Sequence, residues 1–539
     1  MKLFITAFLL IAALTVNAQQ KISKVWVADN GNGSYKNPVL NADYSDPDAI
    51  RVGDDFYMIA SSFDAVPGLP ILHSKDLVNW TLIGHALHRQ PPFDHFEKVQ
   101  HGNGVWAPAI RFYKNEFYIY YPDPDFGIYL TKAKNINGPW SDPVLVEAGK
   151  GLIDPCPLWD DDGKVYLVHA YAGSRAGFKS IIVVKQMNAE GTRTIDDGVL
   201  VYDGHETDAT IEGPKFYKRN GYYYIFAPAG GVSTGWQLVL RSKNIYGPYE
   251  RKVVMDQGST PINGPHQGAW LNTKSGEDWF LHFQDKEAYG RVVHLQPMKW
   301  VNNWPVIGVD KDGDGKGEPV LTYKKPNTGK TYPLATPAED DEFDRVKLGL
   351  QWQWQANPKE GYGFINRSNN SLRLFSVPLP DSMKNYWDVP NILSQKFPAE
   401  EFTATTKFSF TPKPDKTGER FGFTVMGLDY AYLSLKHETN GIFLTYNVCK
   451  KADKGKAETE TIISKFTGKN IFFRVKVDKG AVCTFSYSTD GNSFTAIPEK
   501  FTATPGKWIG AKIGFFFSRN FITNDAGYVD IDWFRITAN

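Results

Sequence analysis

Apolar and aromatic residues gather in short runs along the first half of the chain, and each run follows a polar turn that contains proline. The runs occupy residues 56–59, 117–120, 165–168, 221–226 and 279–281. The turns before them occupy residues 45–48, 105–108, 153–157, 211–214 and 264–268. Short strands separated by Gly, Pro, Asn and Asp turns, repeated roughly every 50 residues, are typical of propeller blades. Five copies therefore predict five blades, and we place this domain at residues 24–325.

The second half of the chain has another pattern. Alternating apolar and polar residues at 403–410, 471–477 and 513–517 predict strands, and turn residues separate them. The repeat does not continue here, so we expect a β-sandwich over residues 335–539. Residues 324–331 are polar and contain Pro and Gly, which fits a linker. The predicted fold is all-β: a five-bladed β-propeller followed by a concanavalin-like jelly-roll sandwich.

Four ionisable residues occupy equivalent positions in the repeat: Asp46, Asp154, Glu212 and His266. Equivalent positions of propeller blades face one central channel, so three carboxyl groups and an imidazole should converge on its axis. Each residue could instead simply cap a turn. Four ionisable groups in register are hard to obtain from turn chemistry alone, and we favour the convergent arrangement.

Glu212 has a sequence context suited to an acid catalyst. It stands between Ile211 and the turn-forming pair Gly213-Pro214, ahead of an aromatic strand. Apolar surroundings can keep a carboxyl group protonated near neutral pH, and such a group can donate a proton to a leaving group.

These positions, together with the segments around them, resemble glycoside hydrolase family 43. The matching segments are 37–40, 46–47, 51–57, 73–80, 105–108, 153–155, 212–214 and 290–297. The second domain is similar to the sandwich appended to β-xylosidases of that family, including residues 350–354. The resemblance covers nearly all of the chain that follows residue 18.

The resemblance implies a role for each matched residue. Asp46 would be the general base and Glu212 the general acid, while Asp154 would orient the acid and tune its protonation. Phe63, Trp106 and Arg291 would contact the sugar. His266 would lie on the channel axis near a calcium ion, held directly or through water. The segment Gly264-Pro265-His266-Gln267 departs from the usual family pattern at this place.

The implied activity is that of an inverting, exo-acting glycoside hydrolase. It would release xylose or arabinofuranose from plant hemicellulose or pectin side chains by general acid/base catalysis. Ala65 stands where xylosidase-type sequences carry an aromatic residue, so the choice of sugar stays open. A galactan-directed hydrolase of the same family and a non-catalytic carbohydrate-binding propeller are the alternatives.

No organic cofactor is expected, and calcium is considered at two further places. Asp341 and Asp532 lie near the two ends of the sandwich, where pairing of its termini could bring them together around a calcium ion; solvated surface acids are the alternative. Residues 310–318 resemble the start of a calcium loop. Leu321 occupies the twelfth position, where that loop needs Glu, so an acidic hairpin is the better interpretation.

Composition narrows the choice of partners. The formal net charge is +1 with 22% charged residues, which gives no basic field for nucleic acid. Aromatic residues make up 14% of the chain, more than a core needs, and aromatic planes suit sugar rings. We expect a plant polysaccharide or oligosaccharide as substrate. The oligomeric state is not specified by the sequence.

Residues 1–18 have the pattern of a secretory signal: Lys2, an apolar run, then small residues before Gln19. No later stretch is apolar enough to cross a bilayer, so we expect a soluble protein exported to the periplasm or the medium. The three cysteines form no disulfide scaffold. Cys449 and Cys483 could pair or remain separate buried thiols, and Cys156 should pack beneath the site.

Overall fold

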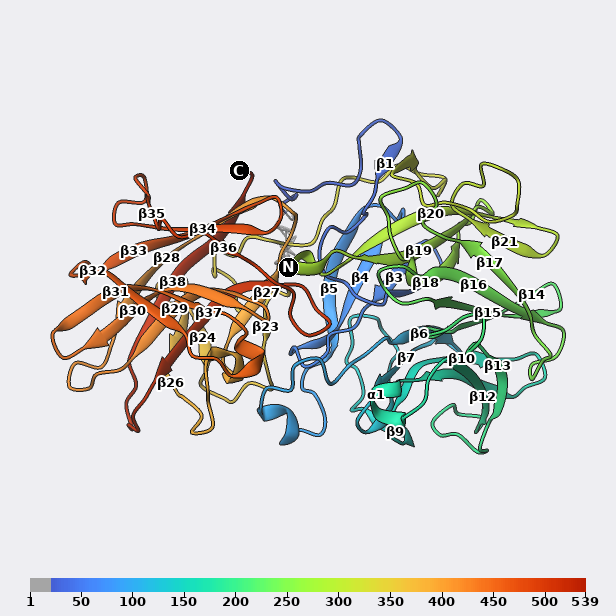
Figure 1. Ribbon diagram of the computed structural model, residues 1–539, viewed down its shortest axis with the longest axis horizontal. Coiled ribbons are helices and arrows are strands. Elements are labelled where there is room, and N and C mark those ends of the chain that lie inside the picture. Colours follow the sequence, from blue (N-terminus) through green and yellow to red (C-terminus); the bar gives the residue numbers. More distant parts are fainter. Residues whose placement is uncertain (1–20) are drawn as a thin grey trace, which may run out of the picture.

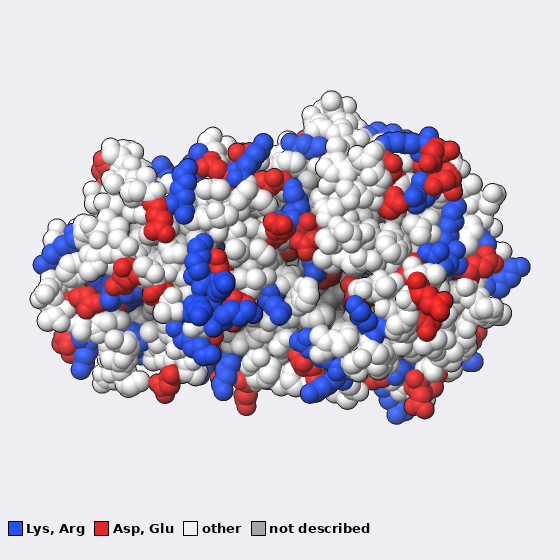
Figure 2. Space-filling model, in the orientation of Figure 1, with Lys and Arg blue, Asp and Glu red and all other residues white. Residues whose placement is uncertain are grey.

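The computed structural model describes residues 21–539, and its regular structure is almost entirely β. A propeller and a sandwich lie side by side along the long axis (Figure 1). The predicted signal at residues 1–18 lies outside the described residues. Basic and acidic side chains are intermixed over the face seen in Figure 2, as the near-zero net charge suggests.

Five four-stranded antiparallel sheets form the propeller, one sheet for each predicted repeat. Blade 1 contains β2 (Asp48–Val52), β3 (Asp55–Ile59), β4 (Gly68–Ser74) and β5 (Trp80–Leu87). Blade 2 contains β6 (Ala109–Tyr113), β7 (Glu116–Asp123), β8 (Gly127–Ala133) and β9 (Val144–Ala148). Blade 3 contains β10 (Leu152–Trp159), β11 (Val165–Tyr171), β12 (Ile181–Met187) and β13 (Val199–Asp203). Blade 4 contains β14 (Lys215–Arg219), β15 (Tyr222–Ala229), β16 (Trp236–Ser242) and β17 (Glu250–Met255). Blade 5 contains β18 (His266–Asn272), β19 (Asp278–Asp285), β20 (Arg291–Val301) and β21 (Trp304–Ile307).

The apolar runs of the sequence are the second strands of the blades, β3, β7, β11, β15 and β19. They are nearly continuous in hydrophobicity because both faces of each blade pack against a neighbouring blade. Five separate apolar clusters result, each shared by two adjacent blades. The cluster between blades 5 and 1, for example, includes the fully buried rings of Trp80 and Trp279.

Contacts between β18 and β2 close the ring of blades. The segment before blade 1 strengthens this closure, because Leu40 pairs with Val293 of blade 5. The strand β1 (Ser34–Lys36) also pairs in antiparallel fashion with β22 (Thr322–Lys324), which follows blade 5. The two ends of the propeller segment therefore lie beside each other.

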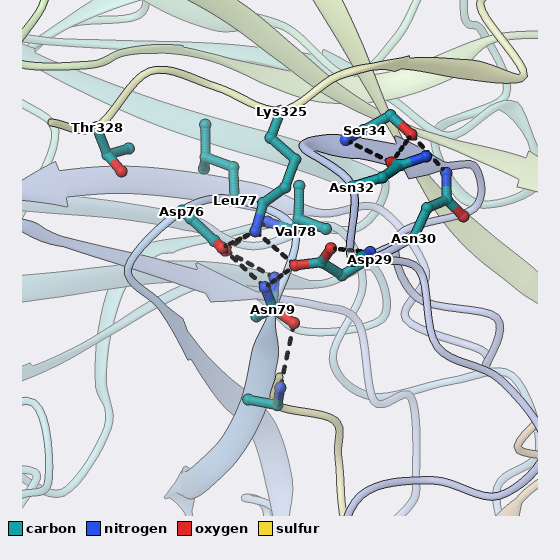
Figure 3. Close-up of polar contacts among 12 residues, drawn as sticks. Asp29, Asn30, Asn32, Ser34, Asp76, Leu77, Val78, Asn79, Lys325 and Thr328 are labelled. Atoms are coloured by element: carbon teal, nitrogen blue, oxygen red, sulfur yellow. Dashed lines mark hydrogen bonds and ion pairs between the residues drawn. The ribbon is translucent and has the colours of Figure 1, made fainter. Parts of the chain in front are cut away.

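Lys325, directly after β22, holds these ends together by charge. Its ammonium group lies 2.5 Å from Asp29 Oδ2 and 2.9 Å from Asp76 Oδ2 (Figure 3). The amide of Asn79 donates to the same two oxygens, at 2.9 and 2.8 Å. We call Asp29, Asp76, Asn79 and Lys325 the clasp. The predicted linker at 324–331 thus begins with the end of a paired strand and a partly buried lysine, since its charges have partners on the propeller.

The sandwich consists of two sheets. One contains β23 (Gln353–Trp354), β27 (Leu393–Lys396), β37 (Lys512–Arg519), β29 (Arg420–Met426), β30 (Tyr430–Glu438), β31 (Gly441–Cys449) and β32 (Thr459–Phe466), with β26 (Val377–Pro378) beside β37. The other contains β24 (Gly363–Asn366), β25 (Ser371–Phe375), β38 (Tyr528–Thr537), β28 (Phe402–Thr411), β33 (Asn470–Asp478), β34 (Val482–Ser488) and β35 (Thr495–Ala496), with β36 (Phe501–Thr502) beside β34. The alternating runs predicted as strands lie in β28, β33 and β37. Their inward residues form one aromatic-rich core between the sheets.

The three cysteines are all buried and free, so Cys449 and Cys483 are separate thiols. Short helices are few: a single turn at α1 (Gly173–Ala176) and four short 3-10 segments make up the helical structure of residues 21–539. Among these residues no helix has the length and hydropathy needed to cross a membrane.

The clasp supports a stability prediction. Lys325→Met leaves two carboxylates with reduced charge compensation, and the lysine side chain is only 15% exposed. We expect a loss of about 2 kcal/mol in unfolding free energy, between the values for exposed and buried ion pairs. Chemical denaturation would measure it. The control Lys324→Met removes a neighbouring lysine that is 67% exposed and should cost at most about 0.5 kcal/mol. Equal losses in both variants would contradict a specific role for the clasp.

Candidate active site

A single cavity at the centre of the propeller collects all three predicted carboxylates. Its volume is about 110 Å³. The lining residues are Asp46, Phe63, Trp106, Ala107, Ile153, Asp154, Glu212, Val232, Gln267, Arg291 and Trp508. A cavity well below the roughly 300–1,000 Å³ of sites for drug-sized ligands is suited to one sugar unit.

The innermost strands position these acids. Asp46 lies two residues before β2, Asp154 lies within β10, and Glu212 lies three residues before β14. Asp46 and Asp154 adopt left-handed backbone conformations, with φ of 54° and 56°. Such conformations are uncommon for residues other than glycine and concentrate at functional sites. Here the left-handed turn aims each carboxyl group toward the axis.

Asp46 is surrounded by hydrogen-bond donors. Its Oδ2 accepts hydrogen bonds from Ser45 Oγ at 2.7 Å and from Ser61 Oγ at 2.5 Å. Arg291 Nη1 donates to Asp46 Oδ1 at 3.2 Å. Two hydroxyl groups and one guanidinium group therefore donate hydrogen bonds to the two oxygens of this carboxylate.

Asp154 is in the opposite electrostatic environment. It is almost completely buried, and Gly213 N donates to its Oδ2 at 2.7 Å. Burial, followed by the negative charge of neighbouring Glu212, raises the pKa of Asp154 to about 8. Burial and the neighbouring carboxylate both disfavour the charged form of Asp154, so this side chain retains its proton to a higher pH than an ordinary aspartate.

Glu212 faces the cavity and is held by His266. The Nε2 atom of His266 lies 2.9 Å from Glu212 Oε1. The histidine is fully buried, whereas the glutamate side chain is 27% exposed, so the glutamate alone of this pair can reach a ligand. His266 was predicted on the channel axis, and the structure gives it this direct contact with the acid.

Phe63, Trp106 and Arg291 line the same cavity. The rings of Phe63 and Trp106 meet edge to face with 6.5 Å between centroids. Phe63 can approach the next blade because Gly104 has no side chain, and a Cβ there would lie 2.4 Å from the Phe63 carbonyl oxygen. An aromatic wall beside a guanidinium group suits a sugar ring, which combines apolar faces with hydroxyl groups.

Trp508 completes the wall, and sequence reasoning missed it. It belongs to the sandwich, in the loop before β37, yet its ring centroid lies 6.2 Å from that of Trp106. The Arg291 guanidinium lies 5.9 Å from the Trp508 ring. The only local signal was a tryptophan between two glycines, Gly506 and Gly510, and nothing in the repeat pattern connects that loop to the propeller axis.

Three other residues singled out in the sequence, Cys156, Asp341 and Asp532, do not line the cavity. Cys156 is buried beneath Asp154, where its sulfur accepts from Arg111 Nη2 at 2.7 Å and from Phe216 N at 3.2 Å. Burial raises the pKa of this thiol, as expected of a packing residue. Asp341 accepts from Phe343 N, Gly349 N and the Trp352 indole. Asp532 pairs with Lys407 at 2.5 Å. The carboxylates of Asp341 and Asp532 therefore bind different partners.

Among residues 21–539, one group of three acidic or histidine side chains lies close enough together for a shared metal. It comprises Asp310, Asp312 and Asp314, on the exposed hairpin that resembled a calcium loop. Near His266 the buried atoms without a protein partner are His266 Nδ1 and Gln267 Oε1. These two atoms fall short of the 6–8 oxygen ligands that calcium takes, so a cation there would be held mainly through water.

Comparison with known proteins agrees with this architecture. Residues 35–305 match the model for glycosyl hydrolases family 43, and residues 340–537 match the β-xylosidase C-terminal concanavalin A-like domain. The chain is 39% identical to a protein of Xylanibacter ruminicola, over 91% of this chain and 88% of that one. It is 34% identical to a β-xylosidase of Formosa agariphila, over 94% and 90%.

A solved structure shows the same two-domain arrangement. The crystal structure of a family 43 protein from Bacillus licheniformis aligns with a TM-score of 0.80 at 25% identity, covering 94% of this chain and all of that one. The family model, the relatives and the shared fold thus lead to one conclusion: this chain is a glycoside hydrolase that belongs to family 43.

Proposed function

We propose that this enzyme is an exo-acting β-xylosidase that removes terminal xylose from plant hemicellulose with inversion of configuration. The observation that carries the proposal is the small central cavity, in which three carboxylates face a space for one sugar unit. The xylosidase-type second domain and the relative named a β-xylosidase support xylose as that sugar. Arabinofuranose is a second candidate, because Ala65 stands where xylosidase-type sequences carry an aromatic residue.

In the proposed mechanism Asp46 is the general base and Glu212 the general acid. Asp46 takes a proton from a water molecule, whose oxygen attacks the anomeric carbon. The glycosidic C–O bond breaks as Glu212 gives its proton to the departing oxygen. Arg291 stabilises the charge of Asp46 and contacts the sugar, while His266 orients Glu212. Asp154 shares the proton with Glu212 and keeps it available at neutral pH.

A substrate screen tests the activity itself. The purified protein should hydrolyse 4-nitrophenyl β-D-xyloside faster than 4-nitrophenyl α-L-arabinofuranoside, and β-D-galactoside should react least. Binding of xylo-oligosaccharides without any turnover would instead support a carbohydrate-binding propeller. NMR of the first sugar released should show the inverted anomer, and retention would reject Asp46 as the base that activates water.

We also propose that the protein is exported and that a calcium ion binds near His266 through water. Amino-terminal sequencing of the protein from its native host should begin at Gln19 if residues 1–18 are removed as a signal. Activity lost on EDTA treatment and restored by calcium would assign a cation to the site, bound through water near His266. Unchanged activity would leave His266 with its contact to Glu212.

The proposed acid makes a prediction about leaving groups. Glu212→Gln cannot deliver a proton, so hydrolysis of xylobiose should fall by roughly 10³-fold or more. A nitrophenyl leaving group departs with little protonation. The rate of hydrolysis of the nitrophenyl xyloside should therefore fall by a factor at least ten times smaller. Steady-state rates on the two substrates measure the difference. Asp46→Asn, which removes the base, is the control and should lower the rates on both substrates by the same factor. Equal decreases on the two substrates in Glu212→Gln would contradict the role of Glu212 as the acid.

The shared proton makes a prediction about pH. The Asp154–Glu212 pair loses its proton as pH rises through the raised pKa, about 8 for Asp154. Above that pH no proton remains for the leaving group. Asp154→Asn removes the carboxyl group whose raised pKa retains this proton beside Glu212, so the proton should be lost at lower pH. The alkaline limb of the profile of kcat/KM should therefore shift to lower pH. An alkaline limb left in place would show that Asp154 binds or packs without influencing the proton.

A further inference from the structure

Asp43 connects the two domains at the edge of the active-site cavity. It lies three residues before Asp46 and is 4% exposed. Its Oδ1 accepts a hydrogen bond from Arg291 N at 2.9 Å, and its Oδ2 accepts one from Gly510 N at 3.0 Å. One carboxylate thus binds the backbone of a propeller residue in the cavity wall and the backbone of the sandwich loop that carries Trp508.

The two backbones meet at this point with no space between them. A Cβ on Gly510 would lie 2.7 Å from Gly290 N, and a Cβ on Gly290 would lie 2.5 Å from the Asp43 side chain. Ala511 N also donates to Ala288 O at 2.7 Å, which continues the contact along the loop. The absence of side chains on both glycines is what allows Asp43 to reach both N–H groups.

We call the contact of Asp43 with Arg291 N and Gly510 N the junction. It fixes two side chains of the cavity. The side chain of Arg291 extends from it to Asp46, at 3.2 Å. Trp508 lies two residues before Gly510 and has a left-handed backbone, with φ of 65°. A strained residue at the tip of a loop keeps its position only when neighbouring contacts hold it. The hydrogen bond from Gly510 to Asp43 is such a contact.

The sandwich also supplies charges that face Asp43. Lys396 at the end of β27 and Lys512 at the start of β37 both interact electrostatically with it. Burial lowers the pKa of Lys512 to about 8, and the negative charges of Asp64 and Asp43 act in the opposite direction. The basic side chains that interact with the buried Asp43 carboxylate therefore come from the other domain, which favours docking of the two domains in one register.

We propose that Asp43 is a positioning residue for the glycosidase reaction. It seats the Trp508 loop of the sandwich against Arg291, so that the second domain forms one wall of the sugar pocket. This inference rests on the proposed function, because the wall matters only if a terminal sugar is bound there. Its direct structural consequence, an ordered loop at residues 506–511, is independent of any substrate.

Two substitutions approach the junction from opposite sides. In Asp43→Asn the amide keeps the shape but presents one acceptor and one N–H₂ donor, so one of the two backbone N–H groups loses its partner. In Gly510→Ala the added methyl group meets Gly290 and pushes the loop outward. Asp530→Asn is the matched control, because Asp530 is a buried carboxylate of the sandwich that pairs with Arg373.

Kinetics with an aryl xyloside provide the functional measurement. Asp43→Asn and Gly510→Ala should each lower kcat/KM by about 10- to 100-fold, the scale expected for misplaced binding groups. In a Trp508→Ala background, Gly510→Ala should have less than a third of that effect, because the methyl group displaces the sandwich loop and the side chain by which that loop lines the cavity is already gone. Asp530→Asn should change kcat/KM less than twofold. Full, multiplicative losses in the double variant, or unchanged kcat/KM in both single variants, would overturn the proposal.

Hydrogen–deuterium exchange separates this inference from the proposed function. In Asp43→Asn, residues 506–511 should exchange at least tenfold faster, and Asp530→Asn should leave them unchanged. Faster exchange in a protein that hydrolyses no aryl glycoside would reject the proposed function while retaining the junction. Unchanged exchange in an active enzyme would reject Asp43 as a positioning residue. If Asp43→Asn does not fold, Gly510→Ala provides the same comparison.

Discussion

Packing between the first and fifth blades closes the ring, and the arrangement of the active site depends on it. Each carboxylate comes from the inner edge of a different blade, and no two of them are neighbours in sequence. Their proximity therefore follows from ring closure. The cluster shared by blades 5 and 1, the pairing of β1 with β22 and the clasp around Lys325 all stabilise that closure. Local order within a blade could not substitute for it.

Within the closed ring, the Asp46 and Asp154 carboxyl groups have different surroundings. Asp46 accepts hydrogen bonds from two serine hydroxyls and from the Arg291 guanidinium. Asp154 is buried with one backbone donor beside another carboxyl group, which favours retention of a proton. The same residue type thus serves two purposes in one cavity, as the environment rather than the side chain decides where the proton resides.

Much of this arrangement could be read from the sequence, because a repeat converts sequence position into spatial position. The interval between turns predicts five blades, and the register within the repeat predicts that Asp46, Asp154 and Glu212 lie together. Trp508 and Asp43 were beyond this reasoning. Trp508 reaches the cavity only through docking of a second domain, and Asp43 differs from other polar loop residues only in its partners, Arg291 N and Gly510 N. The segment at 324–331 has the composition of a linker, and the sequence alone does not show that Lys325 pairs with Asp29 and Asp76, which lie far away in the chain.

The pairing of β1 with β22 has a consequence for how such a protein can be assembled. Since the chain enters and leaves the propeller at one place, the propeller is a closed module that a longer chain could accept as an insertion, or that could be circularly permuted by joining its ends. The pocket is not confined to that module, because one of its walls comes from the sandwich. Exchange of the second domain among such modules would therefore alter the shape of the sugar site while leaving the acids unchanged, and would offer evolution a route to new specificity.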